Sequence, residues 1–397
     1  MSRWSLFPVA PRHDVPTTQR CGLIVPSLDA GGLEEVVAML ATELPAHGFE
    51  TSVLCTHRGG AIADRLQGAG VSVTVAKGSA RQWRAWIKRT QPTVFSTHFV
   101  SLPAAALLAK WAPIVETVHN TYLWLSPKEW EAQRATTALA SAVVAVSETV
   151  ASYHQRTCGP LPATVIPNGV QGSRLPDIAR SDARERLNLG PDDMAFVHVG
   201  RFCAQKNQLG LVDALAEVVG EDARVHLLLV GGQDDAGYVD QVRARAGGLL
   251  TRGAVRFIAP TPDPAFVFAA SDAFVSNSFF EGWSLAATEA LWMGRPVILS
   301  HCGGAREQTG EDGRLGYLVP NPGGDPATLA LQQVQHPSAE VTTVNRNAMQ
   351  LAVRTLIANR AHWASRSDEI AREARARWSS ERMAAEYAAV LRAAAGA

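Results

Sequence analysis

Residues 273–300 read AFVSNSFFEGWSLAATEALWMGRPVILS, and this stretch decides the fold class. A short apolar run, Ala273–Ser276, precedes a loop of charged and polar residues. A helical pattern follows, Gly294 ends it, and a second apolar run, Pro296–Ser300, comes directly after it. Two short apolar runs joined by a helix are typical of a βαβ unit, which holds its two strands parallel.

The same alternation continues in both directions from this unit. Short runs that are apolar on both faces are separated by amphipathic stretches, which indicates parallel sheets covered by helices. The predicted strands are Cys21–Pro26, Thr51–Cys55, Val71–Val75, Thr93–Thr97, Ile114–Val118, Ala142–Val146, Thr164–Ile166, Phe196–Val199, Val225–Val230, Val255–Ile258, Ala273–Ser276, Pro296–Ser300 and Gly316–Val319.

The segment Pro167–Pro176 contains Pro, Asn, Gly and Ser without periodicity, so we interpret it as a linker. A chain of 397 residues is long enough for two domains. We predict an α/β protein of two Rossmann-like, doubly wound domains that face each other across a cleft, over residues 21–172 and 173–378. Residues 1–20 are expected to form a flexible extension, and residues 379–397 are expected to contain a terminal helix.

The bulk composition argues against several classes of protein. A formal net charge of zero does not favour binding to nucleic acid. The five cysteines are scattered without the spacing of a zinc site or a redox pair, so we expect reduced thiols. The most apolar stretch, Leu102–Val115, is interrupted by Lys110 and by prolines, and no signal peptide is evident. These observations predict a cytoplasmic protein.

The loop within the opening stretch contains a dense cluster of candidate site residues, Ser278–Leu285. Ser284 is expected to cap the helix that follows, which places Glu289 about one turn inside it. The free N–H groups of a helix N-terminus suit a phosphate, and Glu281 and Glu289 could accept hydrogen bonds from sugar hydroxyls on either side. The alternative is that both glutamates simply favour a helix N-terminus, and their spacing alone does not decide.

A second cluster, Gly200–Asn207, follows another predicted strand and contains Arg201 and Lys206 around a tight loop. A guanidinium and an ammonium group can together stabilise a pyrophosphate leaving group as its negative charge grows. The alternative is two solvated surface charges. Lys206 is the only lysine after Lys128 in a chain that has five, so we favour the phosphate role.

Taken together, these motifs resemble those of the family 4 retaining glycosyltransferases of GT-B architecture. The resemblance extends over residues 21–395, including a terminal segment that in the family crosses back onto the first domain. The matching segments are Ala30-Gly31-Gly32-Leu33-Glu34, Val118-His119-Asn120, Val165–Val170, Gly200-Arg201…Lys206, Glu281…Glu289, Gly303-Gly304…Glu307 and Trp378–Leu391.

The resemblance implies a donor site with contributions from both domains. Its catalytic residues would be His119, Glu281, Arg201 and Lys206, with His119 near the reacting carbon. The diphosphate would be bound by Gly31, Gly32, Arg201, Lys206, Trp283, Ser284 and Leu285. The ribose would contact Glu289, the sugar Glu281 and Gly282, and the base Phe257 and Ile258.

Residues for the acceptor are expected in loops of the first domain, and the candidates are His98, Asn120 and Trp124. For His119 the alternative is a core histidine bonded to a carbonyl group, and for His98 a purely structural role is an equal alternative. These loops could suit a small molecule, a saccharide or a lipid-linked acceptor.

Three segments depart from the usual family pattern. Ala259-Pro260 stands where the family usually has glycine, Ser276-Asn277-Ser278 replaces Pro-Ser, and Gly282-Trp283-Ser284-Leu285 replaces Gly-Phe-Gly-Leu. None of these changes removes a charge that the chemistry requires, so they bear on the identity of the donor more than on activity.

The resemblance therefore implies transfer of a sugar from a nucleotide diphosphate with retention of configuration, by same-face displacement, and with UDP preferred because uridine is the commonest base in the family. No cofactor is expected, and no metal either, because the chain contains no Asp-x-Asp triplet. A non-catalytic nucleotide-sugar-binding subunit and an epimerase of the same architecture remain alternatives. A dehydrogenase is disfavoured, because Asp29–Gly32 lacks the Gly-x-Gly-x-x-Gly turn.

A predicted connecting helix contains basic residues beside tryptophans: Arg81, Trp83, Arg84, Trp86, Lys88 and Arg89. This pattern could dock on a membrane surface. We favour the other interpretation, in which the tryptophans cover the sheet and the charges are solvated.

Overall fold

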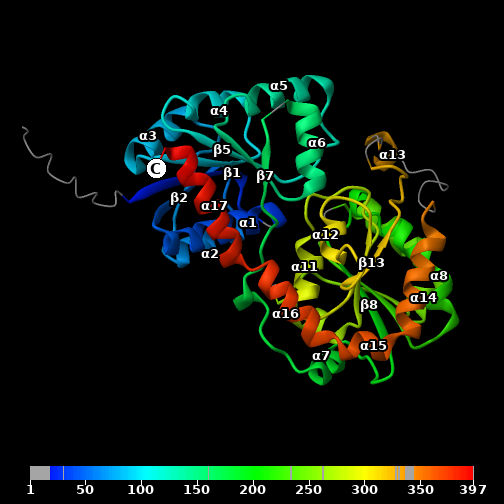
Figure 1. Ribbon diagram of the computed structural model, residues 1–397. Helices are drawn as coiled ribbons and strands as arrows, with labels where there is room; N and C mark the ends of the chain where they lie inside the picture. Colours follow the sequence, from blue (N-terminus) through cyan, green and yellow to red (C-terminus); the bar gives the residue numbers. More distant parts are fainter. Residues whose placement is uncertain are drawn as a thin grey trace, which may run out of the picture.

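The computed structural model describes residues 18–396, except Ala30, Pro160, Gln233, Asp234, Pro262, Ala327, Thr328, Ala330 and 336–343. Residues 1–17 of the predicted extension, Ala30 of the glycine loop and Ala397 therefore lie outside the described residues. The chain forms two α/β domains, each with one parallel sheet between layers of helices (Figure 1).

The first domain has a seven-stranded sheet in the order β3-β2-β1-β4-β5-β6-β7. The chain moves outward from β1 to one edge and then returns to build the other half, which is the doubly wound arrangement. Its strands are β1 (Gln19–Ser27), β2 (Phe49–Arg58), β3 (Ser72–Val75), β4 (Val94–His98), β5 (Ile114–Val118), β6 (Ala142–Ala145) and β7 (Ala163–Val165). Its helices are α1 (Gly32–Glu43), α2 (Ala61–Gly68), α3 (Ala80–Thr90), α4 (Leu102–Leu108), α5 (Pro127–Thr137) and α6 (Glu148–Cys158).

The second domain repeats this winding with six strands in the order β10-β9-β8-β11-β12-β13. Its strands are β8 (Met194–Val199), β9 (Val225–Val230), β10 (Val255–Ile258), β11 (Ala273–Ser276), β12 (Val297–Ser300) and β13 (Gly316–Val319). Its helices are α7 (Arg180–Arg186), α8 (Gln208–Glu221), α9 (Ala236–Thr251), α10 (Ala265–Ala270), α11 (Leu285–Trp292), α12 (Ala305–Thr309), α13 (Leu331–Gln335), α14 (Arg346–Ala358), α15 (Arg360–Ser365) and α16 (Ser367–Arg377). All thirteen predicted strands are present, with ends that differ by a few residues.

Successive residues of a central strand face opposite sides of the first sheet and join different cores. In β1, Leu23 and Val25 pack with α1, α2 and the terminal helix, whereas Ile24 packs with α3 and α4. This explains why the central residues of the strand, Leu23–Val25, are apolar at successive positions. The sheet therefore separates two helical layers, and each layer presents its own outer surface.

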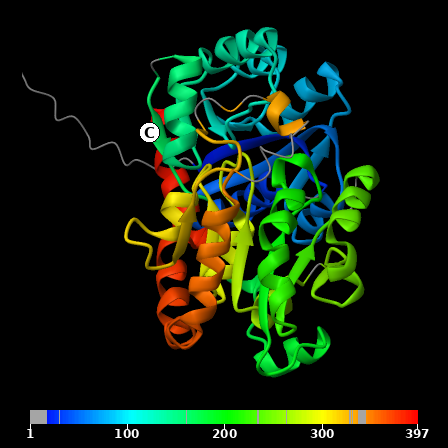
Figure 2. The same ribbon diagram turned by 90° about the vertical axis from the view of Figure 1, so that its right-hand side faces the viewer.

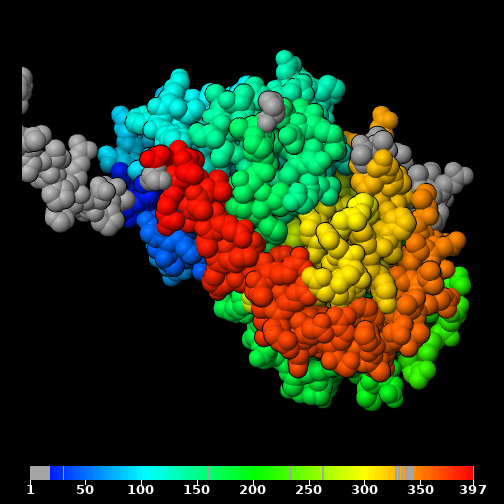
Figure 3. Space-filling view, in the orientation of Figure 1, coloured from blue at the N-terminus to red at the C-terminus, as the bar shows by residue number. Residues whose placement is uncertain are grey.

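The terminal helix α17 (Ser380–Ala395) belongs to the second half of the sequence but packs on the first domain. Figures 2 and 3 show the chain passing along the second domain through α14–α16 and then crossing over as α17. At the crossing, the amide of Val170 donates to the carbonyl of Trp378 at 2.9 Å, and the amide of Ser380 donates to Val170 at 3.0 Å. The two segments that connect the domains are thus bonded to each other.

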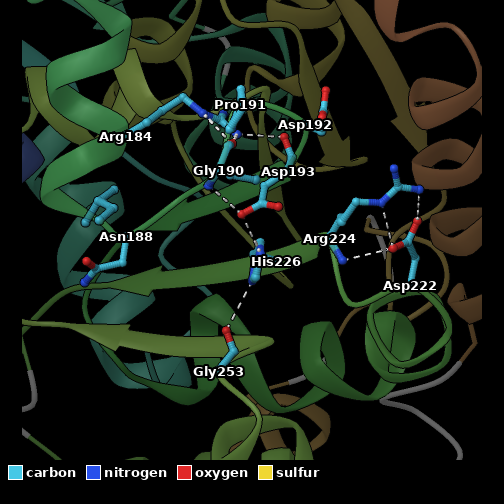
Figure 4. Close-up of polar contacts among 12 residues, drawn as sticks. Arg184, Asn188, Gly190, Pro191, Asp192, Asp193, Asp222, Arg224, His226 and Gly253 are labelled. Carbon is cyan, nitrogen blue, oxygen red and sulfur yellow. Dashed lines mark hydrogen bonds and ion pairs between the residues drawn. The ribbon is translucent and has the colours of Figure 1, made fainter.

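The amino ends of β8 and β9 are held by a separate polar cluster (Figure 4). Arg184 donates to the carbonyls of Gly190 and Asp193, and the Asp193 carboxylate lies 3.2 Å from Nε2 of His226. The other ring nitrogen of His226 contacts the carbonyl of Gly253 at 3.2 Å. The side chains of this cluster form hydrogen bonds with backbone carbonyls of the turns at the amino ends of the strands, away from the carboxyl ends.

No helix in the part of the chain that the structure describes is long and apolar enough to cross a bilayer.

The packing of α17 on the first domain predicts that a leucine-to-alanine substitution in α17 lowers stability more than the same substitution at an exposed position. Leu391 in α17 is 0% exposed, whereas Leu351 in α14 is 67% exposed. We expect Leu391→Ala to destabilise the protein by about 2–5 kcal/mol, because it leaves a cavity, and Leu351→Ala to have little effect. Thermal and denaturant unfolding of the two variants would check this, and equal melting temperatures would contradict the docking of α17.

Candidate active site

The carboxyl ends of the two sheets contain the residues that the sequence singled out. The loops after β1, β4 and β5 come from the first domain, and the loops after β8 and β11 come from the second. In both sheets the strand order reverses at the first strand, between β1 and β4 and between β8 and β11. Ligands of open α/β sheets bind at such positions.

Lys206 and Glu281, which are 75 residues apart in sequence, form an ion pair with Nζ and Oε1 2.5 Å apart. The hydroxyl of Ser278 donates to the same carboxylate oxygen at 2.8 Å. Gln205, the neighbour of Lys206, donates through its side chain to the carbonyl of Phe280 at 2.9 Å. The two predicted loops are therefore joined into one unit, and the orientation of Glu281 is set by two donors.

Arg201 differs from Lys206 in having no partner. Its side chain is exposed and forms no hydrogen bond or ion pair within the described residues, while its backbone carbonyl is held by Gln208 at 2.8 Å. Across the cleft, burial raises the pKa of Glu34, and the positive charge of Arg201 opposes this shift. Arg201 is thus a cation at the mouth of the site that can bind an anion without breaking an existing pair.

Helix α11 begins at this position as the sequence predicted. The hydroxyl of Ser284 accepts from the amide of Ala287 at 3.3 Å, which makes Ser284 the N-cap. Gln308 donates to the carbonyl of Ser284 at 2.7 Å and to Thr288. The indole of Trp283 is buried and donates to Thr288 at 2.8 Å, so a ligand could reach only the backbone of this residue.

Glu289 lies one turn into α11, with 9% of its surface exposed. Burial raises its pKa to about 7, Arg174 opposes this shift, and Glu35 adds to it. Arg174 itself pairs with Glu35 at 3.0 Å. The carboxyl group of Glu289 is therefore a desolvated group that a hydroxyl donor would stabilise in its ionised form.

The two domains approach each other at glycines. A Cβ atom on Gly282 would lie 1.7 Å from the carbonyl oxygen of His119, so only glycine fits there. A Cβ atom on Gly32 would lie 3.6 Å from the side chain of Leu285, which places the glycine loop of the first domain against the start of α11. The structure thus brings the predicted diphosphate residues of both domains together.

His119 and His98 form a bonded pair after β5 and β4. Nε2 of His119 lies 2.8 Å from Nδ1 of His98, and Nε2 of His98 lies 3.1 Å from the hydroxyl of Ser96. Burial lowers the pKa of His119 to about 3 and that of His98 well below its usual value, so both rings are neutral at pH 7. His119 is partly exposed, but His98 is 0% exposed. The predicted direct contact of His98 with an acceptor is therefore not available to it, and it instead orients His119.

An aromatic group adjoins this histidine pair. Trp124 is 39% exposed, and its ring lies 5.3 Å from Tyr122, 6.3 Å from Phe99 and 5.9 Å from Phe280 of the other domain. Phe99 and Tyr122 have φ angles of 59° and 51°, which are strained for bulky residues. The hydroxyl of Tyr122 accepts from the amide of His119 at 3.1 Å. Tyr122 thus connects the aromatic group to the histidine pair.

Two other predicted contacts lie at the edges of this region. Asn120 is partly exposed, and its side-chain oxygen accepts from the amide of Thr121 at 2.7 Å. The ring of Phe257 is stacked on Phe202 at 5.4 Å, and the carbonyl of Ile258 accepts from Gly231 at 3.3 Å. Phe257 and Ile258 lie at the carboxyl end of the edge strand β10. Arg201 follows the carboxyl end of β8, so all three residues lie at the same end of the parallel sheet.

Within the described ranges, no group of three or more His, Cys, Asp or Glu side chains is arranged to hold a metal ion.

Sequence reasoning missed several residues that the structure places at the site. Glu34 stands in the quoted glycine segment but was given no role, and Glu35 was not singled out. Both lie in the first turn of α1, where acidic residues are common for a different reason. Phe99 and Tyr122 could have been noticed only through their backbone angles, which the sequence does not reveal. Ser278 was within the quoted loop, but its bond to Glu281 depends on the turn between them.

Comparison with known proteins finds matches in both domains of the chain. Residues 30–174 match the family model described as Glycosyltransferase Family 4, and residues 194–335 match the one described as Glycosyl transferases group 1. The chain is 33% identical over 168 residues to a D-inositol 3-phosphate glycosyltransferase of Actinosynnema mirum, which is 40% of either protein. For the relative of the same name from Nocardia farcinica, the identity is 32% over 161 residues, covering 39% of this chain and 36% of the relative. The chain thus matches about two fifths of the length of these relatives.

Solved structures show the same fold at low identity. A glycosyltransferase from Rickettsia africae superposes with a TM-score of 0.78 at 17% identity and covers 94% of this chain and 98% of its own. Anabaena HepE in complex with UDP-glucose superposes with a TM-score of 0.75 at 19% identity, covering 94% and 99%. The two wound sheets, the loops that meet between them and the matches to both family models lead to one conclusion: the chain belongs to the family 4 glycosyltransferases with the GT-B fold.

Proposed function

We propose that this chain transfers a sugar from a nucleotide diphosphate sugar, a UDP-sugar by preference, to an acceptor hydroxyl with retention of configuration and without a metal. The proposal is carried by Arg201, an exposed cation without a side-chain partner among the described residues, together with the Lys206–Glu281 pair before the N-terminus of α11. This arrangement leaves positive charge available for a diphosphate, and it supplies a carboxylate on either side for hydroxyl groups.

Each part of the donor would have its own partner. The diphosphate would lie between Arg201, Lys206 and the amides of residues 283–285, opposite the loop of Gly31 and Gly32. The ribose would donate to the carboxyl group of Glu289, which forms no side-chain hydrogen bond within the described residues. The sugar would donate to Glu281. The choice of uridine is motivated by HepE, a protein of the same fold that was crystallised with UDP and with UDP-glucose.

The transfer step needs no protein nucleophile. The bond between the anomeric carbon and the β-phosphate oxygen breaks while the acceptor oxygen bonds to the same face of that carbon. The acceptor's proton passes to the departing phosphate oxygen, so atoms and charge balance. The leaving diphosphate gains charge, which Arg201 and Lys206 stabilise. Glu281 already accepts from Lys206 and Ser278, which supports a role in binding rather than in nucleophilic attack.

On the acceptor side, the exposed faces of Trp124 and Phe99 would pack against the ring or chain of the acceptor. His119, neutral at pH 7 and oriented by His98, would contact the donor sugar close to the anomeric carbon. Because Trp124 also contacts Phe280, which precedes Glu281, an acceptor on this surface would lie next to the donor's sugar.

Calorimetric titration of UDP, GDP and ADP with EDTA present tests the donor site directly. We expect one nucleotide to bind, and Glu289→Ala to weaken it by at least about tenfold through loss of a charge-assisted hydrogen bond. Absence of binding by every nucleotide, or binding only with added metal, would contradict the proposal. Nucleotide binding followed by interconversion of the sugar without transfer would instead identify an epimerase, and binding without any turnover a non-catalytic subunit.

Removal of either cation is expected to slow transfer. We predict that Arg201→Ala and Lys206→Ala each lower kcat by about 10²–10³-fold, by analogy with the loss of one oxyanion donor. Arg201→Lys is the matched control for charge, and Arg252→Ala is the control for an exposed arginine elsewhere. Lys206→Ala also removes a partner of Glu281, so Arg201→Ala is the cleaner test. Near-normal turnover of both alanine variants would exclude the diphosphate clamp.

The raised pKa of Glu289 predicts how donor binding depends on pH. With a pKa of about 7, the carboxyl group is mostly protonated at pH 6 and mostly ionised at pH 8. Affinity for UDP-glucose should therefore rise about tenfold between these values, because the ionised form is the better acceptor of ribose hydroxyls. UDP-glucose is the probe because its diphosphate has no ionisation in this range. If the affinity of Glu289→Gln for UDP-glucose rose with pH as steeply as that of the original chain, the assignment of Glu289 to the ribose would be contradicted.

A further inference from the structure

One face of the first domain has positive charge without compensation. Between Asp64 and Glu116 the sequence contains seven lysines and arginines and no acidic residue, although the whole chain has a net charge of zero. Of these seven, Arg65 lies on α2 and pairs with Glu35 on α1. The other six are Lys77, Arg81, Arg84, Lys88, Arg89 and Lys110, and we call them the basic face.

The basic face belongs to the layer formed by α3 and α4. Trp83 and Trp86 of α3 pack on the sheet together with Ala105 and Leu108 of α4, so both helices cover the same side (Figure 1). All six cations are exposed, and none forms an ion pair within the described residues. Arg89 alone has a side-chain partner, the neutral hydroxyl of Thr74 at 2.9 Å.

The surrounding elements do not cancel this charge. Helix α5 packs beside α4 and contributes Glu129 and Glu131, but also Lys128 and Arg134. The Glu129 carboxylate is held in the cap of its own helix by Ser126. The acidic residues of α1 and α2 lie on the other side of the sheet. The positive field of the basic face is therefore open to solvent.

An exposed tryptophan directly follows one of these cations in the sequence. Trp111 follows Lys110 at the end of α4 and is 48% exposed, whereas Trp83 and Trp86 are only 6% and 0% exposed. The two tryptophans of the predicted helix thus cover the sheet, as we expected from the sequence, and they cannot reach a partner. Trp111 is exposed enough to contact a partner. Surface tryptophans near lysines and arginines are typical of proteins that bind the interfacial region of a bilayer.

We propose that the basic face and Trp111 form a docking surface for an anionic phospholipid membrane. Four to eight cations on one surface attract acidic lipids, and Trp111 supplies the second, apolar contact that charge alone lacks. Phe99 lies in the loop that leads into α4, and Trp111 lies in the turn that leaves it, at the other end of the helix. Docking at this surface does not depend on the proposed transferase activity.

Flotation of the full chain with vesicles tests this surface. We expect binding to vesicles of phosphatidylcholine with 40% phosphatidylglycerol, about tenfold weaker binding to pure phosphatidylcholine, and release at high salt. Arg81→Glu/Arg84→Glu should lower the partition coefficient more than about tenfold. Both positions are exposed in the first half of α3, where a glutamate is compatible with the helix dipole. Trp111→Ser should weaken binding several-fold.

Arg252→Glu/Arg372→Glu is the matched control, since it makes the same change of charge at exposed positions of the second domain. Its binding should stay within about twofold of the original chain. Equal binding to neutral and anionic vesicles, or undiminished binding of Arg81→Glu/Arg84→Glu, would overturn the proposal. So would preferential binding to a single-stranded RNA without vesicle binding. Nucleotide titration of the same variants should be unchanged, which separates this test from that of the donor site.

Discussion

The close approach of Gly282 to the carbonyl of His119 is the constraint on which the site depends. No side chain fits between these two backbones, so the loop before α11 and the loop after β5 meet directly. That contact fixes the separation of the two sheets at their carboxyl ends. Gly32 against Leu285 and the amide of Glu148 donating to Glu307 at 3.0 Å reinforce it. Residues from distant parts of the sequence are therefore brought together in one candidate site.

The charges of the candidate site are unevenly paired among the described residues. Lys206 is neutralised by Glu281, which fixes the geometry of both, while Arg201 remains free. Glu289 is desolvated, and the histidine pair is kept neutral by burial. A bound diphosphate would satisfy Arg201, and hydroxyl donors would satisfy Glu289. The strained backbones of Phe99 and Tyr122 fit this view, because strain is often retained where it positions functional groups.

The two faces of the first domain's sheet are covered by different helices. One face is covered by α1, α2 and α17, which join it to the rest of the molecule. The other is covered by α3 and α4, whose outer surface carries only positive charge. Both layers rest on the same strands, so the proposed docking surface and the crossing between domains use different residues.

The sequence by itself determined the strands, the linker, the cap at Ser284 and the terminal helix, because these follow from local periodicity and from residues such as Gly294 that end helices. It also singled out Arg201, Lys206, Glu281 and Glu289 as candidates, since charged residues in the loop after a predicted strand, or in the first turns of the helix that follows, are conspicuous. It could not decide that Lys206 is paired and Arg201 free, nor that His98 is buried behind His119, because these depend on distances between separate loops. For the same reason only the tertiary structure revealed that Trp83 and Trp86 face inward while Trp111 faces out. Local pattern specifies which elements form, whereas packing between elements specifies which side chains stay available for chemistry.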